Sequence, residues 1–267
     1  MVNEEISLTE RYMLVSYVTG ESFNQVQLKH RLGQQVMTET QQNQYIELLF
    51  RRMEGEPIQY IVGSTDFYGR DFLCEKNVLI PRFDTECLID AVLPKINDGD
   101  LIADICCGSG CIGLTLALEK NVNVLLADIS PYALELSEKN TDKFEKNDKV
   151  RIIKHDVFND TLDGKYTLIV SNPPYIKSAD MIGLSAEVKQ EPTLALDGGE
   201  DGLDFYRHMI AKYKSNLNMN GIMAFECGYD QADAVSEIFR KNGFCNIKKF
   251  KDYNNIERVV VAENTTA

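Results

Sequence analysis

Hydrophobic and polar positions follow a helical period in the first part of the chain. A capping-box pattern begins at Thr38, where Gln41 follows three residues later. Apolar residues then recur at helical spacing as far as Met53, and Gly55 is placed to end the helix. No strand pattern occurs in residues 1–57, so this segment is predicted to be a small helical domain. Further short helices are expected at 12–17 and 23–32.

The pattern changes after residue 57. Residues 58–80 carry β-rich runs that are broken at Gly63 and Gly69, which is typical of a β-hairpin linking two units. From residue 81 onward, strand and helix signals alternate, which predicts a doubly wound α/β domain over 81–267 with a mostly parallel sheet. The last two strands have no helix between them, so an antiparallel pair should end the sheet. Strands are expected at 101–105, 123–128, 151–155, 166–171, 221–226, 244–250 and 258–263, and helices at 111–119, 131–143, 204–217 and 231–242.

Charge restricts the partners of the protein. The 267 residues carry 28 Lys and Arg against 41 Asp and Glu, a net charge of −13 at pH 7. Broad contact with a nucleic-acid backbone needs clustered positive charge, so no direct nucleic-acid partner is expected, and no anionic membrane surface either. The N-terminus lacks a basic region followed by an apolar one, and no run of about 18 apolar residues occurs. We therefore expect a cytoplasmic protein, and a monomer.

The cysteines do not form a recognisable framework. Seven cysteines without regular spacing are typical of reduced thiols. Cys106, Cys107 and Cys111 cluster, but they include no Cys-x-x-Cys pair, and the next histidine in the sequence is His155. We interpret the three as small buried residues in a tight turn, and no metal is expected.

A glycine pattern follows the first strand of the α/β domain. Gly108-x-Gly110-x-x-Gly113 matches the dinucleotide fingerprint, and Asp128 lies 20 residues past Gly108, which alone would indicate an NAD-dependent dehydrogenase. Asp104 argues against that reading, because a carboxylate at this turn would repel nucleotide phosphates. S-adenosylmethionine carries an ammonium and a sulfonium instead, which suit a nearby carboxylate. Asp128 would then accept hydrogen bonds from both ribose hydroxyls.

A second acidic residue follows the third strand. Asp156, or the backbone beside it, is a candidate acceptor for the adenine amino group, with Val157 and Phe158 covering the ring. The alternative is that Asp156 only caps a helix.

A rigid turn follows the fourth strand. The apolar run 168–170 ends in Ser171, and Asn172, Pro173, Pro174 and Tyr175 come next. Such a turn lies at the cofactor edge of the sheet. The Asn172 side-chain oxygen and the Pro173 carbonyl are two acceptors for the hydrogens of a planar amide or amine, and Tyr175 offers a face to pack on it. Catalysis would consist mainly of positioning. The alternative is a Pro-Pro strand terminator with incidental neighbours.

Four stretches occur in an order and spacing that resemble one family. They are "IPRFDTE" (80–86), "SNPPYI" (171–176), "EVKQEPTLALDGGEDGLDFYR" (187–207) and "ERVVVAE" (257–263). The chain is similar over nearly its whole length to the release-factor glutamine methyltransferases, the PrmC/HemK family. The resemblance implies a Rossmann-like class I methyltransferase fold with a seven-stranded sheet, preceded by a helical domain that helps to hold the substrate.

The resemblance also implies the reaction and the site. The expected activity is methylation, from S-adenosylmethionine, of the glutamine side-chain amide in the Gly-Gly-Gln loop of peptide-chain release factors. The substrate amide would be bound by the turn Asn172, Pro173, Pro174 and Tyr175. Cofactor contacts would map onto Cys106, Cys107, Gly108, Ser109, Gly110, Asp128, Val157 and Asn172.

The chain departs from the family at one position of the glycine turn. The family usually has glycine where this chain has Cys106, and a small polar residue where it has Cys107. If the backbone at Cys106 needs a positive φ, the residue is strained there, and cofactor affinity would differ.

Two other functions share parts of this pattern. Nucleic-acid adenine-N6 or guanine-N2 methyltransferases use the same Asn-Pro-Pro-Tyr logic, and a non-catalytic scaffold would keep the fold without the chemistry. The intact set of Asp104, Asp128 and Asn172 argues against a scaffold. An acidic loop argues against a nucleic-acid substrate: residues 187–201 contain Glu187, Glu191, Asp197, Glu200 and Asp201 against Lys189 alone.

Overall fold

The computed structural model describes residues 6–265 and divides the chain into two compact units. The smaller unit is Met1–Ser64 together with Ser185–Gln190, and the larger one is Thr65–Leu184 together with Glu191–Ala267. No helix of the described chain is both long enough and apolar enough to cross a membrane.

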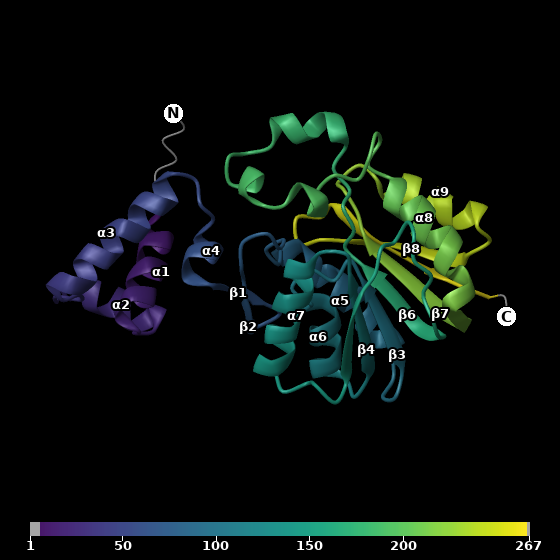
Figure 1. Ribbon diagram of the computed structural model, residues 1–267, viewed down its shortest axis with the longest axis horizontal. Helices are drawn as coiled ribbons and strands as arrows, with labels where there is room; N and C mark the ends of the chain where they lie inside the picture. Colours follow the sequence, from purple (N-terminus) through teal and green to yellow (C-terminus); the bar gives the residue numbers. More distant parts are fainter. Residues whose placement is uncertain (1–5, 266–267) are drawn as a thin grey trace. The chain divides into compact units, whose positions relative to one another are not determined.

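The smaller unit is helical, as the sequence predicts (Figure 1). Its helices are α1 (Leu8–Thr19), α2 (Phe23–Arg31), α3 (Glu39–Met53) and α4 (Ile58–Val62). A complete capping box begins each of the first three helices, which confirms the box predicted at Thr38. Its larger apolar core joins Leu14, Leu48, Ile58 and Ile61.

Helix α4 contradicts the prediction of a hairpin over the whole of 58–80. Residues 58–62 are β-rich in composition, but Ile58, Tyr60 and Ile61 are buried as one helical turn after Pro57. Burial of these side chains overrides their strand propensity. The hairpin itself is shorter and comprises β1 (Ser64–Phe67) and β2 (Arg70–Leu73). Tyr68 and Gly69 both have positive φ, as a two-residue hairpin turn requires.

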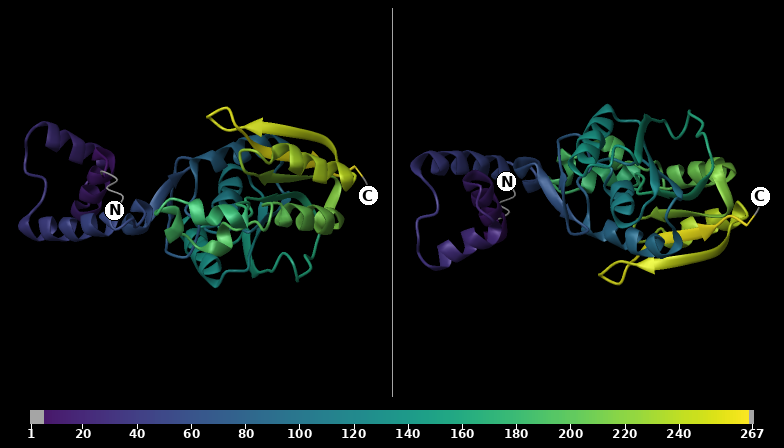
Figure 2. Two further views of the ribbon diagram at one scale, coloured as in Figure 1. Left: turned by 90° about the horizontal axis from the view of Figure 1, so that it is seen from above. Right: turned by 90° about the horizontal axis from the view of Figure 1, so that it is seen from below.

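The larger unit contains the predicted seven-stranded sheet. The strands are β3 (Leu101–Ile105), β4 (Asn123–Asp128), β5 (Val150–Lys154), β6 (Tyr166–Ser171), β7 (Leu217–Glu226), β8 (Cys245–Lys251) and β9 (Glu257–Glu263). Their order is β5-β4-β3-β6-β7-β9-β8; β9 is antiparallel to both β7 and β8, and the other neighbouring pairs are parallel. The antiparallel β8–β9 pair, yellow in Figure 2, lies at one edge of the sheet, as the sequence predicts.

Helices cover both faces of this sheet (Figure 1). Alternate residues of β3 separate the two cores: Ile102 packs on the side of α5 (Glu86–Val92) and α6 (Cys111–Glu119), whereas Ala103 and Ile105 face α8 and α9. Helix α7 (Pro131–Lys143) contacts β4 and β5. Helix α8 (Asp204–Tyr213) ends earlier than predicted, because a 3-10 turn over Lys214–Asn216 leads into β7. Helix α9 spans Ala232–Lys241, and helix α5 was not predicted.

The strand order places a switch point between β3 and β6. From β3 the chain moves to β4 and β5 on one side, and it then returns to β6 on the other side. The connections that leave β3 and β6 therefore diverge at the carboxyl edge of the sheet, which is where doubly wound folds bind their ligands.

Candidate active site

A cavity lies at this switch point, entirely within the larger unit. It encloses about 810 Å³ of empty space, including open solvent at its mouth. Its walls come from the glycine turn after β3, the residues after β4 and β6, and the segment before α5. The residues that line it are Asn77, Val78, Leu79, Ile80, Pro81, Arg82, Thr85, Cys106, Cys107, Gly108, Ser109, Cys111, Ile112, Asp128, Ile129, Ser130, Ala133, Asn172, Pro174, Pro192, Leu194, Ala195 and Phe205.

The glycine turn has the left-handed backbone that its sequence suggests. Gly108 and Gly110 have φ of 55° and 78°. Gly113 is needed for another reason: a Cβ there would lie 2.5 Å from Leu126 Cδ2, so glycine lets α6 approach β4. Cys106 also has a positive φ, 57°, and the strain expected if this position were left-handed is therefore present.

Asp128 ends β4 and holds the glycine turn. Its Oδ2 accepts a hydrogen bond from the Gly108 N–H at 2.9 Å, and its Oδ1 accepts one from the Ser130 N–H at 2.9 Å. Burial raises the pKa of Asp128, and these backbone donors partly offset that rise. The carboxylate lines the cavity, and its remaining lone pairs are available to hydroxyl donors there.

Asp104 lies behind the turn, and it is not among the residues that line the cavity. It is fully buried, and its Oδ2 accepts a hydrogen bond from the Gly113 N–H at 2.9 Å. Its Oδ1 is buried without a hydrogen-bond partner among the described residues, and burial raises the pKa of Asp104 to about 8. Asp104 thus supports the turn from within, and its place beside the methionine end of the cofactor stays a prediction.

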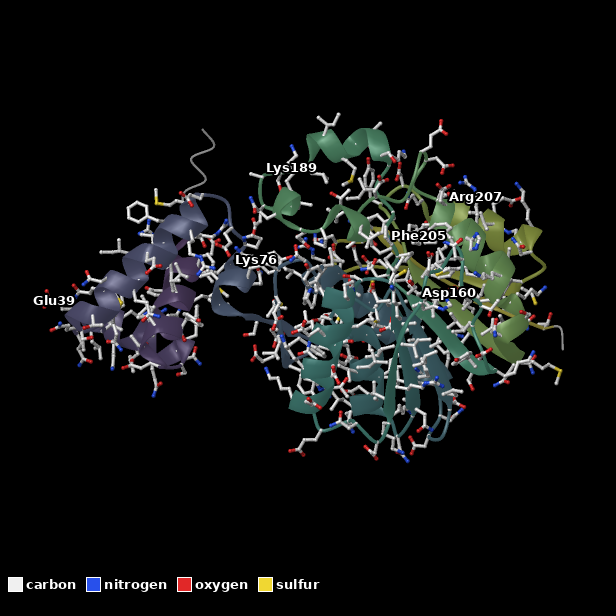
Figure 3. The ribbon with its side chains drawn as sticks, in the orientation of Figure 1. Glu39, Lys76, Asp160, Lys189, Phe205 and Arg207 are labelled. Atoms are coloured by element: carbon white, nitrogen blue, oxygen red, sulfur yellow. The ribbon has the colours of Figure 1, made fainter. Side chains whose placement is uncertain are left out.

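Asp156 and Val157 also lie outside the cavity lining. The Asp156 carboxylate accepts hydrogen bonds from the Phe158 N–H at 2.9 Å and from Asn159 Nδ2 at 2.7 Å, and these bonds lower its pKa. These bonds close a local turn that no helix follows, so the alternative of a helix cap at Asp156 is wrong. Val157 is buried. The exposed Phe158 packs instead against Phe205, with ring centroids 4.9 Å apart. Phe205, which Figure 3 labels, belongs to α8 and lines the cavity.

The cysteines near the turn are free thiols. Burial raises the pKa of Cys106, Cys107 and Cys111 well above the ordinary value, so these thiols stay protonated. Among residues 6–265, no group of three or more His, Cys, Asp or Glu side chains is arranged to hold a metal ion.

The Asn-Pro-Pro-Tyr turn is clamped by the loop before α8. Ile176 N–H donates to the Leu196 carbonyl at 2.9 Å, and Gly198 N–H donates back to the Ile176 carbonyl at 2.8 Å. A Cβ on Gly198 would lie 2.7 Å from Tyr175 Cα, so glycine permits this close approach. Gln231 Nε2 donates to the Tyr175 carbonyl at 2.9 Å. The motif in residues 187–207 thus serves to fix the backbone of the turn.

Within the turn, Asn172 and Pro174 line the cavity, whereas Pro173 and Tyr175 do not. Pro173 is buried and has no N–H, so its carbonyl is its one polar backbone group. The Tyr175 hydroxyl points to Glu226, with 3.5 Å between Oη and Oε1. Burial raises the pKa of Tyr175, so the phenol stays neutral.

Two residues near Asn172 were not predicted as site residues. Asn172 Nδ2 donates to Thr85 Oγ1 at 3.2 Å, and Glu226 lies at the end of β7 beside both. Burial raises the pKa of Glu226 to about 7, although Thr85, the Arg258 charge and Asn172 all lower it. The sequence carried a signal for Glu226, which ends a predicted strand at the same edge. Thr85 lies in the stretch 80–86 that carries part of the family resemblance, but that stretch did not indicate its contact with Asn172.

The carboxylates of the loop 187–201 are largely paired, which corrects the picture of an acidic rim. Glu191 is buried and paired with Arg82, and Asp201 is paired with Arg207. In the smaller unit, Glu187 lies 3.4 Å from Arg52. These ion pairs cancel much of the charge on which the argument against nucleic acid relied.

The cavity fits the chemistry of S-adenosylmethionine. The turn 106–109 offers close backbone approach, Asp128 offers acceptors for ribose hydroxyls, and Ile129, Leu194 and Phe205 provide apolar surface for a base. Asp104 does not decide between a cationic ligand and phosphates, because its raised pKa of about 8 leaves the carboxyl largely protonated at neutral pH.

Fold and cavity together define a methyltransferase. The family model described as "Methyltransferase small domain" matches residues 83–191, and the one described as "PrmC N-terminal domain" matches residues 5–63. A solved methyltransferase from Pyrococcus furiosus has a TM-score of 0.58 at 17% identity, covering 75% of this chain and 91% of its own. S-adenosylmethionine is the cofactor of this class.

Curated relatives identify the family. A release factor glutamine methyltransferase of Clostridium acetobutylicum is 39% identical over 266 residues, which is 97% of this chain and 92% of the relative. Relatives of the same name from Geobacter sulfurreducens and Bacillus cereus are each 40% identical, over 80% and 85% of this chain and 75% and 83% of their own length. The chain belongs to the release factor glutamine methyltransferases.

Proposed function

We propose that this protein transfers a methyl group from S-adenosylmethionine to the side-chain amide nitrogen (N5) of the glutamine in the Gly-Gly-Gln motif of peptide-chain release factors, and so supports translation termination. One observation carries the proposal beyond family membership. Asn172, the first residue of the Asn-Pro-Pro-Tyr turn, lines the same cavity as Gly108 and Asp128. A planar amide held by Asn172 therefore shares one space with the cofactor turn.

The turn has the chemistry that an amide substrate needs. An amide nitrogen is a poor nucleophile because its lone pair is delocalised into the carbonyl group. Asn172 Oδ1 and the Pro173 carbonyl are two acceptors for its two hydrogens, and accepting both would fix the direction of the nitrogen. When bound, S-adenosylmethionine supplies an electrophilic methyl group. Positioning of this kind is worth roughly 7–11 kcal/mol of the barrier when the geometry is good.

The proposal assigns substrate docking to residues 1–57. Helix α3 exposes Ile46, Phe50 and Met53, with 47%, 61% and 57% of their surfaces accessible. Their spacing of four and three residues places them on one face of the helix. An apolar face of this kind on a small helical unit is suited to contact with a protein, and the release factor is the partner that the family names imply.

The proposal also includes a monomeric, cytoplasmic enzyme without a nucleic-acid partner. The net charge of −13 supports this part, because nucleic-acid binding requires clustered Lys and Arg. Since the carboxylates near the site are paired, the substrate class needs a direct comparison of protein and nucleic-acid acceptors.

Mass spectrometry of release-factor digests would test the proposal. Incubation with the protein and S-adenosylmethionine should add the net mass of one methylene to the Gly-Gly-Gln peptide, because a methyl group replaces a hydrogen. Asn172→Ala should lower kcat roughly 10²-fold or more, as loss of an electrostatic stabiliser does. A release factor whose motif glutamine is replaced by asparagine serves as the control substrate. Methylation of RNA or DNA oligonucleotides in place of the factor would refute the substrate assignment.

A further inference from the structure

Asn172 has two chemically different ends, and the proposed reaction can use only one. Its Oδ1 accepts hydrogen bonds, whereas its Nδ2 only donates them. If the amide were turned by 180°, two N–H donors would face the N–H groups of the substrate amide. Some feature of the site must therefore fix which end faces the cavity.

Thr85 contacts the donor end. Asn172 Nδ2 donates to Thr85 Oγ1 at 3.2 Å, and this leaves Oδ1 free to face the substrate. A hydroxyl can donate as well as accept, however, so Thr85 alone would tolerate either end of the amide. The preference must come from the group that orients the Thr85 hydroxyl, together with any acceptor that meets Asn172 Nδ2 directly.

Glu226 is placed to orient the Thr85 hydroxyl. It is 2% exposed at the end of β7, and the pairing of Ser171 with Phe225 brings it level with Asn172, the next residue after β6. An ionised carboxylate only accepts hydrogen bonds, so it orders its neighbours in one direction. Hydrogen bonds from Thr85 and from Asn172 both lower the pKa of Glu226, and a Thr85 hydroxyl that donates to the carboxylate turns its lone pair toward Asn172 Nδ2. The Tyr175 hydroxyl donates to the same carboxylate at 3.5 Å.

We propose that Glu226 and Thr85 are positioning residues, and that the ionised Glu226 orients the Thr85 hydroxyl so that Asn172 presents its oxygen to the reacting amide. The inference rests on the proposed function, because it assumes that the substrate nitrogen carries hydrogens to be accepted. A buried carboxyl at this point would otherwise only destabilise the fold, since its Oε2 has no hydrogen-bond partner among the described residues.

Because the orientation of Asn172 depends on the charge of Glu226, that orientation should depend on pH. Burial raises the pKa of Glu226 to about 7; the Arg258 guanidinium lowers it and the Asp84 carboxylate raises it. The other groups that face it stay neutral, because burial raises the pKa of Cys227 and Cys87 to about 12 and that of Tyr175 still higher. A protonated Glu226 can donate to Thr85, and Thr85 is then free to donate to Asn172 Oδ1. The wrong orientation becomes accessible below about pH 7.

Steady-state kinetics on a Gly-Gly-Gln peptide would test this orientation of Asn172 through kcat. Thr85→Val removes the hydroxyl at nearly constant volume, and Thr85→Ser keeps it and is the matched control. Thr85→Val and Glu226→Gln should each lower kcat roughly tenfold, the cost of one hydrogen bond. The KM for the peptide and the affinity for S-adenosylhomocysteine should stay within about twofold, and Thr85→Ser should retain the wild-type kcat. The wild-type kcat should rise with pH through about 7, and the Glu226→Gln profile should be flat.

Side-chain amide spectra test the same inference without turnover. In the ¹⁵N–¹H spectrum of the free protein, the Asn172 amide signals, assigned by their loss in Asn172→Ala, should shift with pH around 7 in the wild type and not in Glu226→Gln. An unchanged kcat in Thr85→Val, or Asn172 signals that do not titrate, would overturn the inference. A wild-type protein that methylates neither the peptide nor an intact release factor would overturn the proposed function instead, and the spectra would still decide the orientation of Asn172.

Discussion

The left-handed backbone of Cys106 allows its strain to be measured by a pair of substitutions. Cys106→Gly and Cys106→Ala both remove the thiol, so they differ only in one methyl group. At a φ of 57° that methyl group costs a non-glycine residue roughly 1–2 kcal/mol. The glycine variant avoids this cost but loses roughly 0.5–1 kcal/mol of stability, because glycine has more conformational entropy in the unfolded chain. Cys106→Gly should therefore be more stable than Cys106→Ala by about 0.5–1 kcal/mol.

The neighbouring cysteine is the control. Cys107 is buried in the same turn, but its φ lies outside the left-handed region. There the methyl group carries no conformational cost, so Cys107→Gly should be less stable than Cys107→Ala by about 0.5–1 kcal/mol. Subtracting the Gly-minus-Ala stability difference at Cys107 from the same difference at Cys106 cancels the effect of the greater freedom of glycine in the unfolded chain. The remainder should be about 1–2 kcal/mol, which is the left-handed cost itself.

Urea unfolding followed by far-ultraviolet circular dichroism is suited to the four variants, because the chain contains no tryptophan. The comparison requires equal m-values within each pair, since a changed m-value would report a change in the unfolded or native ensemble. If Cys106→Ala proves at least as stable as Cys106→Gly, the turn relaxes around a side chain and the strain assigned to Cys106 is refuted.

Three further predictions concern the cofactor turn, the buried acid and the docking face. Asp128→Ala should weaken S-adenosylhomocysteine binding by about 1.5–3 kcal/mol in calorimetry, the range for a charge-assisted hydrogen bond; unchanged affinity would remove Asp128 from the cofactor site. Asp104 has a raised folded-state pKa, about 8, so its contribution to stability is complete below its unfolded pKa near 3.8 and is lost as the pH rises through 8. Asp104→Asn should therefore flatten the fall of unfolding free energy with pH by up to about 1.4 kcal/mol per unit, and an unaltered slope would contradict the raised pKa. Phe50→Ser should lower kcat/KM for an intact release factor but not for a Gly-Gly-Gln peptide. The control is Met219→Ser, which replaces an equally exposed apolar residue of the larger unit and should change neither value. Equal loss on both substrates in Phe50→Ser would refute docking by α3.

Periodicity was sufficient to predict the number and order along the chain of the sheet strands, although β7 begins at Leu217 and not at the predicted residue 221. Strand ends were predicted best where a local signal marks them. The run 166–171 ends at a Pro-Pro pair, and 101–105 ends at a glycine turn, so neither boundary depends on distant residues. The antiparallel end followed from the missing helix between the last two strands. Where local signals were ambiguous, prediction failed. Residues 58–62 have strand propensity, yet burial of Ile58 and Ile61 in the core of the smaller unit makes them a helix.

For the site residues too, some features could be predicted from the sequence and others could not. The backbone of both turns was predictable. Gly108 and Gly110 indicate a left-handed conformation after β3, and Asn172 follows the buried strand β6. The direction of side chains was not. Asp104 and Asp156 have the sequence positions of cofactor contacts, but one turns inward to Gly113 and the other closes a local turn. A single residue's position along a strand does not fix which polar neighbour its carboxylate will meet.

Glu226 and Thr85 mark the limit of sequence reasoning at this site. A carboxylate that ends a strand next to β6 can be expected near Asn172 once the strand order is known, because parallel strands end at one edge. Thr85 reaches the same point from a 3-10 turn 87 residues away in the sequence. Its hydroxyl gains a role only when an acceptor lies on one side and an amide on the other. The orientation of Asn172 is therefore a property of three packed segments, and no one of them encodes it alone.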